Sequence, residues 1–200
     1  MNATKSKRII ALLAAIVLSV GLSLAVSASS TTEPPLLGGN LIWNIESIYY
    51  YVDSSANSFV TPIANAAYNW VYTGYGWNNL YPNSRTYNIT YSAIDIYSSA
   101  DGNNGYTTFW ARTNGTTGNA YSVNPNSQNW LFNEVKLNSK YLSNQTDAYK
   151  QGVVAHEMGH CFGLNENNTN PYSIMCQAGH GRAVTTVQQV DQNAFNRKHP

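Results

Sequence analysis

Residues 153–166 read VVAHEMGHCFGLNE, and this stretch decides most of what we expect of the fold and the chemistry. His156 and His160 stand one helical turn apart, and residues at i and i+4 lie above one another on one helix face. Two imidazoles in this arrangement can bind one metal ion. Glu157 points about 100° round the helix axis, so its carboxylate can reach a water beside the metal without binding the metal itself. The spacing predicts a helix that carries two metal ligands and one general base.

The His-Glu-x-x-His motif is specific for a chain of this composition. With 4 His and 5 Glu in 200 residues, the expected number of chance matches is about 0.002. Two histidines could also belong to a structural zinc site, but such sites usually have four protein ligands and do not need a glutamate in the general-base position. We therefore expect a catalytic Zn²⁺, with Glu157 taking a proton from water.

The run from His156 to Glu166 has the form HExxHxxGxxE, which resembles the extended zinc signature of the metzincin endopeptidases except at its last position. Ser173-Ile174-Met175 resembles the Met-turn of that clan, with Met175 as the floor beneath the metal. Over residues 41–198 the chain is similar to secreted bacterial matrixin-like metalloproteases. The resemblance implies an α+β fold: a twisted, mixed, five-stranded sheet with two long helices above it and a small lower lobe with the Met-turn and a C-terminal helix.

The third zinc ligand is the point at which the chain departs from the family pattern. The resemblance places Glu166 at a position that usually holds His and, in one small secreted group, Asp. A carboxylate oxygen is a competent zinc ligand, so we expect His156, His160 and Glu166 to bind the metal. His180, which lies between Gly179 and Gly181 just after the Met-turn, is the alternative. We expect His199 to be solvated near the C-terminus.

The 2 cysteines lie beside the residues of the expected site, since Cys161 follows a ligand and Cys176 follows Met175. An even number of cysteines in an exported protein indicates a disulfide. If Met175 lies beneath the metal, as the resemblance implies, the two sulfurs are neighbours. We expect a Cys161–Cys176 disulfide; a cysteine ligand to zinc is the alternative.

The N-terminal region has the layout of a secretory signal peptide. Lysines and an arginine at positions 5–8 precede the apolar run 9–26, and small residues at 26–28 provide a cleavage site. We expect residues 1–28 to be removed and the protein to be extracellular; an uncleaved membrane anchor is the alternative. Residues 29–40 are rich in Ser, Thr, Pro and Gly and predict a linker, and residues 41–200 predict the catalytic domain.

Composition excludes several classes of protein. Charged residues make up 10% of the chain and the formal net charge is +1. Without residues 1–28, 172 residues remain, with 8 Lys and Arg against 10 Asp and Glu. This balance offers no basic surplus for nucleic acid, and the high aromatic content argues against disorder. No second long apolar run follows the leader, so we expect no membrane association after cleavage. We also expect the protein to be a monomer.

Apolar periodicity and turn residues predict the remaining elements. The resemblance to metzincins implies that residues 118–123 form the edge strand that aligns an extended peptide; an ordinary surface strand is the alternative. We expect strands at 45–52, 87–91, 94–97, 106–112, 120–123 and 131–137, and helices at about 61–73, 146–163 and 186–197.

Two functions from different classes follow from these observations. The first is a secreted zinc endopeptidase that cleaves protein or peptide substrates with Glu157 as its general base. The second is a non-catalytic secreted or surface binding protein on the same scaffold. Glu157 distinguishes them, because a binding protein does not need it.

Overall fold

The computed structural model describes residues 31–78 and 85–200. The predicted signal peptide, residues 1–28, lies outside the described residues. Within the two described ranges, no helix combines the length and the apolar character needed to cross a membrane.

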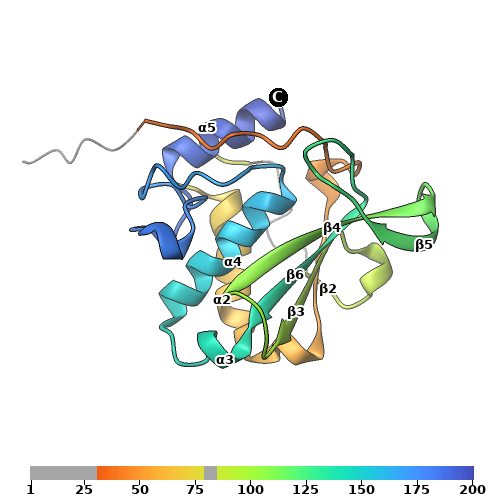
Figure 1. The fold of residues 1–200 in the computed structure, drawn as a ribbon, viewed down its shortest axis with the longest axis horizontal. Coiled ribbons are helices and arrows are strands. Elements are labelled where there is room, and N and C mark those ends of the chain that lie inside the picture. The colour runs from red at the N-terminus through yellow and green to blue at the C-terminus, as the bar shows by residue number, and fades with distance from the viewer. Residues whose placement is uncertain (1–30, 79–84) are drawn as a thin grey trace, which may run out of the picture.

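One mixed sheet of six strands forms the centre of the fold, in the order β2-β1-β3-β6-β4-β5 (Figure 1). β2, β1, β3 and β6 run parallel to one another, whereas β4 is antiparallel to both β6 and β5. The predicted α+β class is confirmed. The sheet has six strands rather than the expected five, with β2 and β5 at its two edges. The bounds are β1 (Tyr50–Val52), β2 (Arg85–Thr86), β3 (Ile94–Ser99), β4 (Gly105–Asn114), β5 (Thr117–Ser122) and β6 (Phe132–Asn138).

In the described part of the chain, four α-helices accompany the sheet: α2 (Val60–Val71), α3 (Ser139–Leu142), α4 (Asp147–Cys161) and α5 (Gln189–Lys198). Figure 1 shows α2 and α4 side by side against one face of the sheet. The start of α4 is as predicted, because the side chain of Thr146 accepts a hydrogen bond from the Tyr149 N–H. From Gly152 to Gly159 every residue of α4 is buried, so this helix runs through the interior of the protein.

An aromatic cluster joins α2, α5 and the C-terminal end of α4. The ring of Trp70 on α2 lies 5.2 Å from Phe162 and 5.9 Å from Phe195 on α5, centroid to centroid. The indole N–H of Trp70 donates to the carbonyl of Ala155 at 2.8 Å, so the buried indole is satisfied. These contacts hold α4 and its C-terminal end against α2 and α5.

One predicted strand is wrong and another is shorter than predicted, because asparagine side chains start 3₁₀ turns there. Asn44 accepts from the Glu46 N–H and starts η1 (Ile45–Ser47), so only the end of the predicted strand 45–52 is extended. Asn88 accepts from the Thr90 N–H and starts η3 (Ile89–Tyr91) in place of strand 87–91. Such side chains offer the backbone an alternative to sheet hydrogen bonds. The other 3₁₀ helices are η2 (Ser54–Phe59) and η4 (Ala178–His180).

Residues 31–40, predicted as part of a linker, pack against the body of the protein instead. Leu36 forms an antiparallel bridge with Leu164, and the Asn165 N–H donates to the carbonyl of Pro35 at 2.8 Å. Leu37 is only 5% exposed. Lys198 on α5 donates to the carbonyl of Leu37 at 2.7 Å, and Figure 1 shows this segment running beside α5. Composition suggested a linker, but backbone pairing and a buried leucine hold the segment in place. We call residues 31–40 the N-terminal strap.

Candidate metal centre

Helix α4 carries the two histidines of the motif and turns both toward the loop that follows it. Their side chains are 7% and 13% exposed, and their rings lie 4.8 Å apart, centroid to centroid. The chain leaves the helix at Gly163, whose φ of 88° is the left-handed conformation that glycine adopts at helix ends. This turn returns the loop 164–166 to the histidine face of α4. The predicted alignment of His156 and His160 on one face is confirmed.

Both imidazoles are oriented by backbone carbonyls. His156 Nδ1 lies 2.9 Å from the carbonyl oxygen of Ile174, and His160 Nδ1 lies 2.9 Å from that of Leu164. A carbonyl oxygen only accepts, so each Nδ1 is the protonated donor. The Nε2 atoms therefore remain available to bind a metal, as in metal sites where histidine donates its other N–H to the protein.

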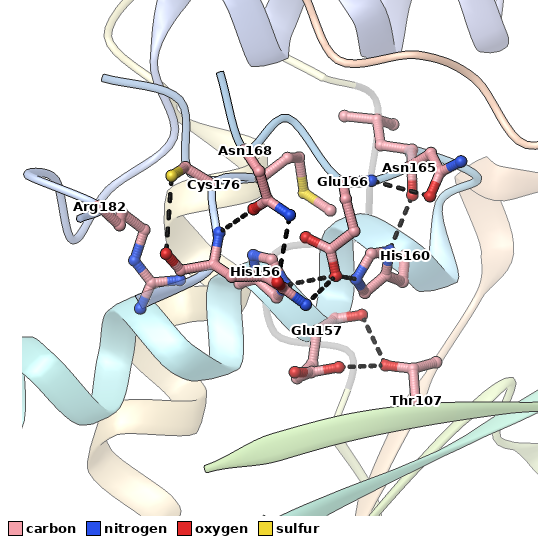
Figure 2. A network of polar contacts seen from close by, with 12 residues as sticks. Thr107, His156, Glu157, His160, Asn165, Glu166, Asn168, Cys176 and Arg182 are labelled. Carbon is pink, nitrogen blue, oxygen red and sulfur yellow. Dashed lines mark hydrogen bonds and ion pairs between the residues drawn. The ribbon is translucent and has the colours of Figure 1, made fainter. Parts of the chain in front are cut away.

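Glu166 reaches the same point from the loop. Its Oε1 lies 3.3 Å from His160 Nε2 and 3.6 Å from His156 Nε2 (Figure 2). Burial raises the pKa of the Glu166 carboxyl, but hydrogen bonds and charge from the two histidines outweigh it and lower the pKa to about 2. Burial likewise lowers the pKa of His160, but the hydrogen bond to the Glu166 carboxylate and the charges of Glu157 and Glu166 raise it overall.

These three residues fit a zinc ion. Their ligand atoms all lie within 4.8 Å of one another. Two imidazole nitrogens and one carboxylate oxygen are the donor set of a catalytic zinc site with three protein ligands. Glu166 Oε2 is buried and has no hydrogen-bond partner among the described residues. A buried carboxylate oxygen without a donor is costly, and a divalent cation would satisfy it.

The alternative ligand His180 lies outside this cluster. It ends η4, is exposed and lines the same cleft farther along. His199 is not the solvated tail residue that we expected. Its Nε2 lies 2.8 Å from the carbonyl oxygen of Phe162, its ring packs on Phe195, and burial lowers its pKa. His199 therefore belongs to the contacts between α5 and the end of α4.

Glu157 points from α4 toward strand β4 and lines the same cleft as the ligand cluster (Figure 2). It is 5% exposed, and its Oε2 accepts a hydrogen bond from the Thr107 hydroxyl at 2.7 Å. A Cβ on Gly105 would lie 3.0 Å from Glu157 Oε1, so glycine at this position leaves room for the carboxylate. Gly105 and Thr107 were not identified from the sequence, because only the packing of β4 on α4 brings them to Glu157.

Met175 is fully buried under the ligand helix. A Cβ on Gly159 would overlap the Met175 sulfur, so the glycine between the two histidines allows this close approach. The turn itself is held by Asp191 of α5, which accepts from the Ser173 hydroxyl and from the Ile174 N–H. Asp191 thereby fixes Ile174, whose carbonyl orients His156.

The expected Cys161–Cys176 disulfide is not formed, and both thiols are free and buried. The Cys161 thiol lies 3.4 Å from the carbonyl of Glu157, one turn back on α4. The Cys176 thiol contacts the carbonyl of His180 at 3.8 Å. Residues 157 and 161 share a helix face, so Cys161 points to the side of Glu157 and away from the Met175 turn. Burial raises the pKa of both thiols.

The three candidate ligands and Glu157 line a cleft of about 740 Å³. The β4 residues Gly105, Tyr106 and Thr107 form one wall, and residues 177–182 form the other. Leu37 of the N-terminal strap and Pro125 close one end. A chain segment in the cleft would pass directly over His156, Glu157 and His160.

In comparisons with known proteins, the chain matches no protein-family model and no curated protein. The residues of the cleft and their chemistry therefore carry the evidence for its function.

Proposed function

We propose that this protein is a secreted zinc endopeptidase with a metzincin-like catalytic domain. The observation that carries the proposal is the arrangement in the cleft. Three zinc-type ligand atoms converge beside a buried glutamate that is too far round the helix to bind the same metal. His156, His160 and Glu166 would hold the metal, and Glu157 would be the general base.

In the proposed reaction the protein's own groups bind the peptide and move one proton. Bound zinc supplies Lewis acidity, which polarises a carbonyl and acidifies water. Glu157 accepts the proton of the attacking water and then gives it to the nitrogen of the departing amine. The Thr107 hydroxyl holds one carboxylate oxygen of Glu157 at 2.7 Å, which leaves the other oxygen for the proton transfer.

The free edge of β4 is the proposed binding site for the peptide main chain. β5 pairs with β4 from Trp110 onward, and the Val123 N–H extends this ladder to the Phe109 carbonyl. The chain then turns away at Asn124. Alternation along the strand directs the main-chain groups of Thr107 to the same edge, facing the cleft. An extended peptide that continues the ladder would lie over the zinc ligands. Residues 118–123, which we expected to align the substrate, belong instead to β5 and its end, which pair with β4 from Phe109 onward.

The remaining features of the proposal follow from the sequence. Residues 1–28 would direct export and then be removed. The released protein would be a monomer that acts on extracellular proteins or peptides. The Met175 turn beneath the ligand helix and the cleft between sheet and loop support the metzincin-like assignment.

Hydrolysis of a denatured protein tests this function, with zinc content measured on the same samples. The wild type should cleave the substrate, and Glu157→Gln should keep its zinc and lose at least about 100-fold in rate. Glu46→Gln, the same substitution outside the cleft, should behave as the wild type. If the wild type holds zinc but cleaves nothing, the endopeptidase proposal is wrong and the binding-protein alternative takes its place.

A further inference from the structure

Arg182 is a guanidinium in the cleft that no carboxylate neutralises. Its Nη1 donates weakly to the carbonyl of Ile174 at 3.5 Å. Within residues 31–78 and 85–200 it forms no ion pair. Burial lowers its pKa, against the opposing effect of nearby acidic groups, of which Tyr149 and Glu157 contribute most. A half-buried cation without a counter-ion is costly, and a ligand carboxylate would offset that cost.

The charges that line the cleft favour an acidic ligand. Among the described residues of its walls, Glu157 and Glu166 are the only acids, and Arg182 is the only lysine or arginine. A zinc ion held by the proposed ligands would balance the charge of the two glutamates. The charge of Arg182 would then remain, so the zinc-loaded cleft would be cationic and would attract anionic side chains.

The position of Arg182 identifies which substrate residue it would meet. Its Nη2 lies 3.4 Å from the place that a Cβ would take on Gly152, one helical turn before His156. One turn is about 5.4 Å along the helix. Figure 2 shows Arg182 on the segment that follows Cys176, beside His156 and not among the ligand atoms. An aspartate or glutamate side chain next to the scissile bond can span the one helical turn that separates Arg182 from His156.

The direction of the peptide follows from the β4 edge. A Cβ on Gly105 would lie 2.9 Å from Val153, the neighbour of Gly152, so Gly105 and Arg182 lie at the same end of the cleft. Phe109 lies toward the other end. A substrate that continues the β5 ladder runs antiparallel to β4, from Phe109 toward Gly105. Its residues after the scissile bond therefore lie at the Arg182 end.

We propose that Arg182 is a specificity-determining residue, which binds the carboxylate of an aspartate or glutamate immediately C-terminal to the scissile bond. This inference rests on the proposed endopeptidase function and adds its substrate class. A structural role, in which Arg182 only supports His156 through Ile174, would change zinc binding and overall rate but not the preference between substrates.

The test compares paired peptides that differ only in Asp or Asn at that position, chosen from cleavage sites mapped by mass spectrometry in a denatured protein. For the wild type, kcat/KM should favour Asp on the order of 10- to 100-fold, as a charge-assisted hydrogen bond provides. Arg182→Gln should reduce this ratio to about 1 and leave the zinc dissociation constant unchanged. Arg112→Gln removes the same charge outside the cleft and should retain the wild-type ratio.

Further variants keep the result interpretable. Arg182→Lys should retain part of the preference, and Arg182→Glu should shift it toward a basic residue; thermal melting shows whether each variant is folded. Equal cleavage of Asp and Asn peptides by the wild type, or an unchanged ratio in folded Arg182→Gln, would overturn the proposal. If the zinc-loaded wild type cleaves no peptide, the endopeptidase function fails separately. Titration of alanine-rich hexapeptides with a central Asp or Asn then decides whether Arg182 recognises the carboxylate, and equal affinities would refute it.

Discussion

Replacing Gln177 with leucine should weaken zinc binding, although Gln177 is not itself a ligand. Its Nε2 donates to Glu166 Oε1 at 3.0 Å, the oxygen that also faces both histidines. Gln177 is in turn fixed by Asn168, which donates to Gln177 Oε1 at 3.1 Å and accepts from the Gln177 N–H at 2.9 Å. Leucine has a similar volume but cannot donate, so Glu166 would lose the contact that orients its carboxylate.

The exposure of Gln177 limits the size of this effect. A hydrogen bond to a charged group contributes about 1.5–3 kcal/mol when it is buried. Gln177 is exposed, and water can replace part of its contact with Glu166, whose side chain is 30% exposed. We therefore expect the lower end, about 1.4 kcal/mol, which is about a tenfold rise in the zinc dissociation constant. Asn168→Ala should have a smaller effect, because it acts only through Gln177.

Competition with a fluorescent zinc chelator measures these dissociation constants directly. Gln189→Ala, on the exposed first turn of α5, is the matched control and should bind zinc as the wild type does. If Gln177→Leu stays within about twofold of the wild type while Glu166→Ala loses zinc, Gln177 does not orient the ligand. If Glu166→Ala also retains the wild-type affinity, the assigned ligand set is wrong.

Three further predictions concern the general base, the N-terminal strap and a buried acid. Thr107→Val should lower the rate of hydrolysis about 10- to 100-fold at unchanged zinc affinity. Thr108→Val, on the other face of β4, should leave the rate unchanged. Equal losses of rate in the two variants would refute the role of Thr107 in orienting Glu157. A chain that begins at Leu41 should bind zinc at least about tenfold more weakly than one that begins at Thr31, because the N-terminal strap holds Asn165 beside Glu166. Equal zinc dissociation constants for the two chains would show that the strap is dispensable. Burial raises the pKa of Asp95 from 3.8 to about 7, so the folded state binds a proton that the unfolded chain has lost, and stability falls as pH rises from about 4 to 7. Asp95→Asn should remove this fall and stabilise the metal-free protein at pH 8 by at most about 4 kcal/mol in urea unfolding; parallel pH profiles for variant and wild type would contradict it.

The local features of the site could be predicted from the sequence because they depend on helix geometry alone. The i, i+4 spacing fixed His156 and His160 on one face of α4, and Gly163 ended the helix so that Glu166 could return to them. The same geometry also bears on Cys161. It stands one turn after Glu157, on the face that turns from the Met175 loop, and this position argues against the disulfide that proximity in sequence suggested.

The features that failed to emerge from the sequence depend on long-range packing. Thr107 lies 50 residues before Glu157, and nothing in its own strand indicates which residue it will face. The N-terminal strap has the composition of a linker, but its backbone pairs with Leu164 and its carbonyls accept from Lys198. Asn44 and Asn88 replaced predicted strand by 3₁₀ turns through local side-chain contacts. Such contacts compete with strand pairing, and only the fold decides between them.

Titration of Zn²⁺ into the metal-free wild-type protein, with the rate of peptide hydrolysis as the readout, decides whether the protein is a zinc endopeptidase. We expect no hydrolysis without zinc, a rise in rate with each addition, and a plateau at one zinc ion per chain. Hydrolysis that proceeds without zinc, or zinc that binds at one ion per chain without any hydrolysis, would contradict it.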